Sequence, residues 1–215
     1  MKATDACVCP YPAGDSTLAR MALEARELGF DSIVVIGEGD GEPRDLRILR
    51  GVVISASSQK EAIRQVRKPA VRAADVVFVN AGDTAFNRAA AAVEEVHVIR
   101  NIHAARRGAF DHVAARTAAD RGTAVDISLY PIIGFRGRRR QTALQRYADI
   151  LGLHRRYDFP LTISSGARSI LEQRSVREIH GLCGLFGMTE DEVTCALSSI
   201  GRLIEPYRPV RVVSE

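Results

Sequence analysis

Arginine is concentrated in the second half of the chain, where its guanidinium groups can bind phosphate. Between Arg100 and Arg156 there are twelve arginines and four aspartates, with no lysine or glutamate, so this segment carries a net charge of +8 in a chain of +4. Four of these arginines stand in the run Phe135-Arg-Gly-Arg-Arg-Arg140, just before and at the start of a predicted helix. Positive charge there opposes the helix dipole, and a bound phosphate would offset this unfavourable interaction.

The planar guanidinium fork matches phosphate oxygens, so such a cluster favours contact with a nucleic-acid backbone. A solvated basic face explains the cluster equally well, as does a genome that prefers arginine, since the chain uses 27 arginines and only three lysines. Aromatic residues make up 6% of the chain and are not interleaved with the cluster. We therefore expect recognition of structured RNA by shape and phosphate contacts, and no stacking platform for single strands.

Two cysteines lie close together near the amino terminus and are the first candidates for metal ligands. Cys7 and Cys9 are two apart on a predicted strand, so their side chains point to the same side. A structural zinc site needs two further ligands, but Cys183 and Cys195 stand in helical patterns and form no second close pair. We expect Cys7 and Cys9 to be buried, unreactive thiols.

The remaining candidates for chemistry are weaker. His97, His103 and Asp126 can in principle assemble a metal site, although nothing in their spacing requires one. Residues 164–166, Ser-Ser-Gly, indicate a tight turn between a strand and a helix, and no Gly-x-Ser-x-Gly motif is present. The loop 37–43 has three glycines and three acidic residues, so we interpret it as a surface connection and not as a phosphate loop. We predict neither catalytic nor metal-binding residues in this chain.

Apolar runs alternate with amphipathic stretches along the whole sequence, which is typical of βα units and a parallel sheet or barrel. About seven strands are expected, at 3–9, 32–36, 46–54, 76–80, 96–99, 124–129 and 161–164. Helices are expected after Asp15 or Ser16, after Ser57 or Ser58, and at 83–92, 110–121, 138–157, 176–186 and 190–204, the last with a capping box formed by Thr189 and Glu192. We predict one α/β barrel domain over 3–205 and a C-terminal tail over 206–215.

Composition places the chain among globular proteins. Apolar residues make up 46% and charged residues 26%, and no apolar run approaches the ~18 residues that span a bilayer. The amino terminus does not resemble a secretory signal, and four scattered cysteines do not suggest a disulfide framework. We expect a cytoplasmic protein without a membrane partner. A pI near 9.1 permits a polyanionic partner.

Several segments, in their order and spacing, resemble the archaeal ribonuclease P protein component 3 family. The likeness covers roughly residues 3–205 and is carried by segments 14–20, 28–35, 75–82, 87–88, 111–115, 124–129, 146–150 and 157–168. The resemblance implies a TIM-like barrel related to PHP-type metal-dependent hydrolases. Those enzymes carry His-x-His where Cys7-x-Cys9 stands here, so the hydrolytic centre looks lost.

The resemblance also implies a function and a set of partners. The chain would be a protein subunit of the ribonucleoprotein that removes 5′ leaders from precursor tRNA. It would bind and stabilise the catalytic RNA together with protein component 2, in a heterotetramer with two copies of each protein. The holoenzyme would be an endoribonuclease whose active site lies in the RNA. No cofactor would be bound by this chain, and Mg²⁺ would belong to the RNA.

The resemblance points to two regions that can converge on one RNA-facing surface. They hold Asn80, Gly82, Asn87 and Arg88, and Ser164, Ser165, Ala167 and Arg168. Together with the cationic cluster they give the predicted RNA-binding residues Arg88, Arg106, Arg107, Arg136, Arg138, Arg139, Arg140 and Arg168. Two alternatives stay open: a PHP-like phosphoesterase that uses metal directly, and a structural barrel that binds only protein partners.

Overall fold

A computed structural model describes residues 2–37 and 46–204. Most of the loop 37–43 and the tail 206–215 therefore lie outside the described residues. No helix in the part of the chain that is described is both long and apolar enough to cross a membrane.

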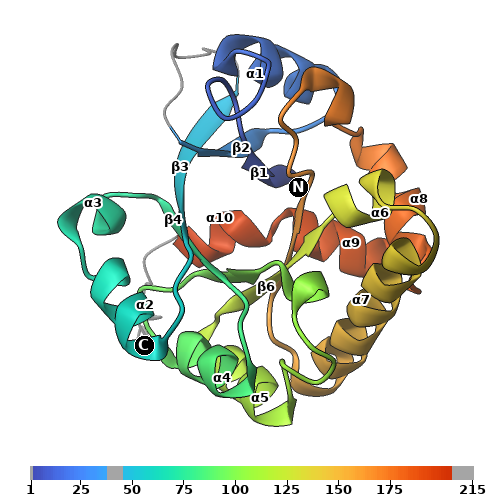
Figure 1. The fold of residues 1–215 in the computed structure, drawn as a ribbon. Helices are drawn as coiled ribbons and strands as arrows, with labels where there is room; N and C mark the ends of the chain where they lie inside the picture. The colour runs from blue at the N-terminus through green and yellow to red at the C-terminus, as the bar shows by residue number, and fades with distance from the viewer. Residues whose placement is uncertain (1, 38–45, 205–215) are drawn as a thin grey trace, which may run out of the picture.

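Seven parallel strands form one sheet in which each strand pairs with the next along the chain. The sheet curves into a nearly closed barrel (Figure 1), because the segment after the last strand returns to the first: Gly166 N donates to Cys7 O at 3.0 Å and Cys9 N donates to Ala167 O at 2.8 Å. This confirms the predicted barrel. The strands are β1 Thr4–Val8, β2 Ser32–Ile36, β3 Arg47–Ile54, β4 Val76–Asn80, β5 Val98–Arg100, β6 Ala124–Ser128 and β7 Leu161–Ser164.

Helices surround the barrel (Figure 1) and bury its outer face in the main apolar core. They are α1 Leu18–Glu27, α2 Gln59–Val66, α3 Pro69–Arg72, α4 Thr84–Ala92, α5 His112–Arg121, α6 Tyr130–Gly134, α7 Gly137–Tyr157, α8 Val176–Gly184, α9 Glu190–Leu197 and α10 Ser199–Ile204. Two 3₁₀ turns, η1 Ile102–Ala104 and η2 Ile170–Glu172, follow β5 and β7. The predicted caps Ser58 and Thr189 are confirmed, the latter within a capping box.

Three of the predicted boundaries that were wrong have clear local reasons. Helix α1 is capped by Thr17, because the Asp15 carboxylate accepts instead from the Ser16 hydroxyl at 2.7 Å. The fifth strand starts at Val98, two residues later than expected, and ends at Arg100. The helix expected over 190–204 is divided at Ser198, where side chains of Ser198 and Ser199 both donate to Cys195 O at 2.9 Å and compete with the backbone.

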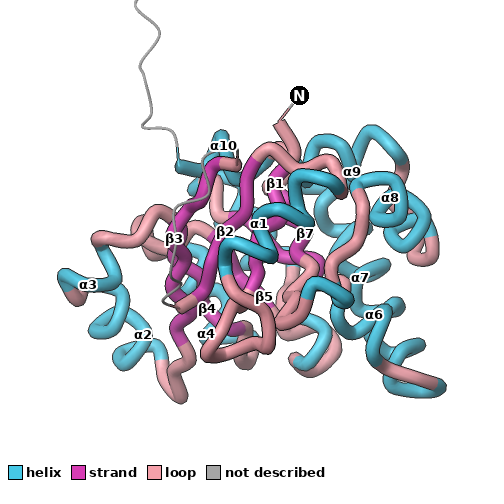
Figure 2. Tube along the Cα trace, turned by 90° about the horizontal axis from the view of Figure 1, so that it is seen from above, coloured by secondary structure: helices cyan, strands magenta, loops and turns pink. Residues whose placement is uncertain are grey.

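Helix α10 covers one end of the barrel. Its Ile200 joins a separate apolar cluster with Ala6, Val34, Leu49 and Phe78, which come from four different strands. Figure 2 shows α10 near the amino-terminal ends of the strands and α6 at the opposite end. The carboxyl ends of the strands, here called the mouth of the barrel, are therefore the end at which loops can build a site.

Candidate nucleic-acid interface

Arg100 is the central charged residue inside the mouth. Side chains alternate along a strand, so Arg100 points into the barrel like Val98, which belongs to the interior apolar cluster. Its Nη1 donates to Cys7 Sγ at 3.2 Å, and the guanidinium lies 5.7 Å from the centre of the Phe78 ring. Arg100 is 9% exposed. Arg100 contributes to the net charge of segment 100–156, but its burial separates it from the exposed arginines of that segment.

Two buried carboxyl groups, those of Asp126 and Asp5, also lie in strands of the barrel. Asp126 accepts hydrogen bonds from the hydroxyls of Thr162 at 3.1 Å and Ser164 at 2.7 Å, and its burial raises its pKa although the charge of Arg100 opposes that shift. Asp5 accepts from the backbone N–H groups of Cys7 and Ser165, while its second oxygen, Oδ2, has no hydrogen-bond partner among the described residues. Burial raises the pKa of Asp5 to about 6.

The two cysteines differ in their environments. Strand β1 changes register between Asp5 and Val8 and ends before Cys9, which is half-buried, whereas Cys7 is fully buried. A hydrogen bond between the two thiols, together with burial, raises the pKa of Cys7. The same hydrogen bond and the charges of Arg100 and Arg168 lower the pKa of Cys9 to about 7. The burial expected for both thiols is therefore confirmed for Cys7, whereas Cys9 is only half-buried.

The histidines considered as metal ligands do not come together. His97 and His103 flank β5 at opposite ends, and the Nδ1 of His97 accepts from Val77 N at 3.1 Å. His103 packs against the Tyr147 ring, and burial together with the charge of Arg100 lowers its pKa to about 4. Across residues 2–37 and 46–204, no three His, Cys, Asp or Glu side chains gather as a set that could hold a metal ion.

Most residues of the two regions that the resemblance singled out have structural roles. Asn87 is fully buried, and its amide bonds to Gly82 N, Gly82 O and Ala109 O, which fixes the turn between β4 and α4. Ser164 holds Asp126, and Ala167 closes the barrel against Val8. Of these eight residues only Arg88 and Arg168 are exposed, so these two arginines remain the candidates for RNA contact.

Arg88 is exposed, and its guanidinium is held in place. It binds both carboxylate oxygens of Asp111, which also caps α5 by accepting from Val113 N and Ala114 N. The hydrogen bonds from Arg88 keep the pKa of Asp111 low, at about 2. An RNA phosphate at Arg88 would have to compete with this carboxylate.

The other predicted arginines lie in segments that follow β5, β6 and β7 and hence near the mouth (Figures 1 and 2). Arg106 and Arg107 follow η1 and are exposed, with Arg107 Nε 3.4 Å from Asp149 Oδ2. Arg168 follows β7 and is exposed. Whether these side chains contact RNA stays a prediction.

Four arginines surround the start of α7. Arg136 is the residue that precedes the helix, and its Nη1 donates to Ile133 O at 2.6 Å. Arg138 and Arg139 are exposed in the first turn, while Arg140 is half-buried, and its buried Nε has no partner in the described part of the chain. No acidic residue occurs between Asp126 and Asp149, so the charge of this turn is not neutralised by nearby sequence.

Aromatic rings accompany these arginines, contrary to the sequence prediction. The Arg139 guanidinium lies 4.4 Å from the centre of the Phe135 ring, and Phe135 packs edge-on against Tyr130 at 5.8 Å. Tyr130 is 50% exposed. Tyr130 precedes the arginine run by six residues, and the short helix α6 folds it back beside that run. Composition alone could not reveal this proximity.

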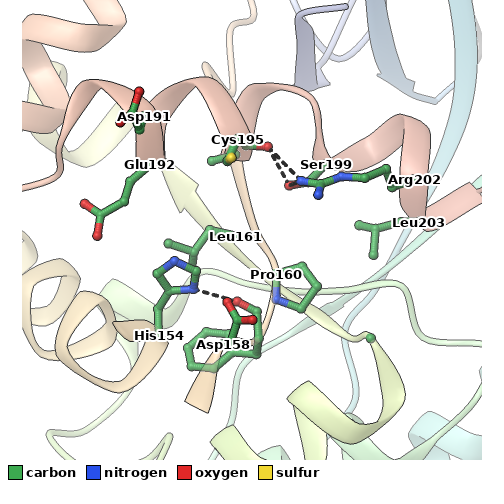
Figure 3. A pocket seen from close by; sticks show the side chains of 13 residues that line it. His154, Asp158, Pro160, Leu161, Asp191, Glu192, Cys195, Ser199, Arg202 and Leu203 are labelled. Atoms are coloured by element: carbon green, nitrogen blue, oxygen red, sulfur yellow. Dashed lines mark hydrogen bonds between the residues drawn. The ribbon is translucent and has the colours of Figure 1, made fainter. Parts of the chain in front are cut away.

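A hollow of about 530 Å³ lies elsewhere, between the C-terminal end of α7 and helices α9 and α10 (Figure 3). Two of its polar side chains already have internal partners: His154 Nδ1 bonds to Phe159 O at 2.7 Å, and Glu192 is paired with Arg155. It includes none of the predicted RNA-binding arginines.

Comparison with known sequences gives one family along almost the whole chain. The family described as RNase P subunit p30 matches residues 2–208. Ribonuclease P protein component 3 of Methanothermobacter thermautotrophicus is 34% identical over 201 residues, which cover 86% of this chain and 81% of that protein.

Comparison with solved structures supports the fold. A chain in the cryo-EM structure of archaeal ribonuclease P with mature tRNA matches with a TM-score of 0.77 and 18% identity, covering 94% of this chain and 89% of that chain. Histidinol phosphate phosphatase from Lactococcus lactis, solved with zinc, L-histidinol and phosphate, matches with a TM-score of 0.56 and 12% identity over 86% of this chain and 94% of that chain. At these identities the two matches establish the barrel fold alone.

Proposed function

Because the chain belongs to the RNase P subunit p30 family, we propose that it is a protein subunit of ribonuclease P. In this role it supports the RNA-catalysed removal of 5′ leaders from precursor tRNA by binding and stabilising the catalytic RNA. The endoribonuclease is the holoenzyme, and this subunit is not its catalyst.

The arginine distribution at the mouth supports this proposal most directly. Arg106, Arg107, Arg138, Arg139 and Arg168 are exposed near the same end of the barrel. Guanidinium groups on a rigid scaffold can neutralise phosphates that RNA segments must otherwise bring together against their mutual repulsion. The subunit would thereby lower the amount of Mg²⁺ that the catalytic RNA needs to fold.

The partners follow from the same proposal. The chain would act with ribonuclease P protein component 2, in a heterotetramer of two copies each, and would contact the catalytic RNA and precursor tRNA. It would bind no cofactor itself, and the Mg²⁺ of the reaction would be held by the RNA.

A PHP-like phosphoesterase was the alternative, and the donor set of the mouth disfavours it. The positive charge of Arg100 lies beside Cys7 and interacts with Asp126, so it would repel a divalent cation there. Metal analysis of the purified protein tests this alternative, which requires bound metal near stoichiometry.

The proposal is tested by reconstituting precursor-tRNA cleavage from the cognate catalytic RNA and component 2, with and without this chain, across a Mg²⁺ titration. We expect the chain to shift the half-maximal Mg²⁺ concentration downward and to raise the rate at limiting Mg²⁺. Identical titrations with and without the chain would refute the proposal.

A further inference from the structure

The segment between β6 and α7 presents an aromatic ring to solvent beside the arginine run. Helix α6 is anchored by its buried residues Pro131 and Ile132, and Leu129 before it is fully buried. Tyr130 lies on the opposite side, with half of its surface exposed, and no other described residue bonds to its hydroxyl. The fold thus places this ring at the surface while burying its apolar neighbours.

The ring is held rigidly. It meets Phe135 edge-on at 5.8 Å with an interplanar angle of 78°, and Phe135 in turn packs edge-on against His103 at 6.1 Å. A Cβ atom added at Gly134 would lie 3.4 Å from Cε2 of Tyr130, so the ring packs directly against the glycine backbone. A rigid aromatic ring loses little conformational freedom when it binds a flat ligand.

The surroundings of the ring are cationic. Arg139 stacks on Phe135, the neighbour of Tyr130, and Arg138 is exposed in the same turn. Among the described residues, Arg136, Arg138 and Arg139 form no ion pair with a carboxylate. A ligand that offers both a flat apolar face and negative charge complements this surface, and a nucleotide has both.

We infer that Tyr130, Phe135 and Arg139 form a stacking platform for an unpaired base of RNA, with Arg136 and Arg138 binding its flanking phosphates. The base is unpaired because a duplex hides the faces of its internal bases and leaves only edges and phosphates accessible. The inference rests on the proposed function and refines it, since it names the kind of RNA element bound at the mouth.

The test uses the full chain and two labelled probes, a single-stranded adenosine decamer and an RNA duplex of the same length. Replacing Tyr130 by Ala or Leu should weaken binding of the single strand by roughly 5- to 50-fold, because stacking on the ring is lost, and should change duplex binding less than twofold. Tyr130→Phe should bind like the wild type. Leu185→Ala, which alters a side chain of similar exposure, 53% against 50%, is the matched control.

The chain contains no tryptophan, so Tyr130→Trp introduces a single indole whose fluorescence reports stacking. We expect the adenosine decamer to quench this fluorescence and the duplex to leave it nearly unchanged.

Equal affinities of all Tyr130 variants, or failure of the wild type to bind the single strand, would overturn the inference. It would also be overturned if Tyr130→Ala weakened binding of component 2 and not of RNA. If all Tyr130 variants bind RNA equally but the chain still lowers the Mg²⁺ requirement of cleavage, the stacking platform is refuted and the proposed function stands.

Discussion

Arg100 introduces a permanent positive charge into the barrel at the level of Cys7 and Asp126. A buried guanidinium is tolerated only where acceptors or opposite charges surround it, and here Cys7 Sγ accepts a hydrogen bond while Asp126 interacts with it electrostatically. The cation lies where the carboxyl ends of the strands meet, the end at which barrel enzymes place their chemistry. At this position the positive charge of Arg100 is balanced by Cys7 and Asp126, and these side chains do not form a set of metal ligands.

Alternation along β5 accounts for the inward direction of Arg100, but the sequence did not show that the strand extends to this residue. The predicted strand ended at Ile99, so Arg100 was counted only in the charge of the arginine-rich segment. A similar limit applied to Cys9, because a change of register within β1 depends on pairing with β2, which strand periodicity does not encode.

The buried carboxyl of Asp5 gives a pH-dependent prediction. Its pKa in the folded state is about 6, above the usual value near 4, so its contribution to stability is fully present below pH 4 and is lost as the pH rises through 6. Asp5→Asn removes this titration while keeping an oxygen that can accept from Cys7 N and Ser165 N.

Urea unfolding at pH 4.5 and 7.5 measures this effect as a difference between the two proteins. We expect the free energy of unfolding of Asp5→Asn, relative to the wild type, to increase by about 2 kcal/mol between these pH values. A difference that is independent of pH would show that Asp5 does not titrate in this range.

At the scale of elements, the start of α7 is the part whose charge most favours binding of anions. Its first turn has arginines and no acidic residue, and the side chain of the residue before it, Arg136, forms no cap. The helix itself was predicted almost to its ends, because apolar residues recur along it at helical spacing. Helix α6 was missed, since five residues with a proline near the start give too short a pattern to recognise.

The first turn of α7 predicts a salt-dependent effect. Replacing Arg138, Arg139 and Arg140 by alanine should weaken binding to the catalytic RNA, and the slope of log K against log salt should become shallower by about 2, because fewer counterions are released. The matched control replaces three exposed arginines in the region of α2 and α3 (Figure 1). Arg64 lies on α2, Arg67 directly follows α2, and Arg72 is the last residue of α3.

Binding isotherms between 50 and 300 mM salt give this slope for both variants. The two variants are comparable because each loses three positive charges. An unchanged slope in the α7 variant, or an equal change in the control, would show that the first turn of α7 does not contact phosphate.

At the scale of the whole molecule, the two ends of the barrel differ in character. Helix α10 fills the amino-terminal end with apolar contacts, whereas the carboxyl end combines buried polar groups with exposed arginines. The alternation of strands and helices was enough to predict seven parallel strands. It could not predict which arginines are paired internally, as Arg88 and Arg155 are, because those pairs join residues 23 and 37 positions apart.

The central claim is that this chain assists RNA-based cleavage through the cationic mouth of its barrel. The most direct measurement is the rate of precursor-tRNA cleavage at limiting Mg²⁺ by holoenzyme reconstituted with the wild type, the Arg138, Arg139 and Arg140 triple variant, or the Arg64, Arg67 and Arg72 control. We predict a rate loss of about tenfold for the first variant, which corresponds to ~1.4 kcal/mol and is recovered at high Mg²⁺, and no loss for the control. Equal rates for all three proteins at limiting Mg²⁺ would contradict the claim.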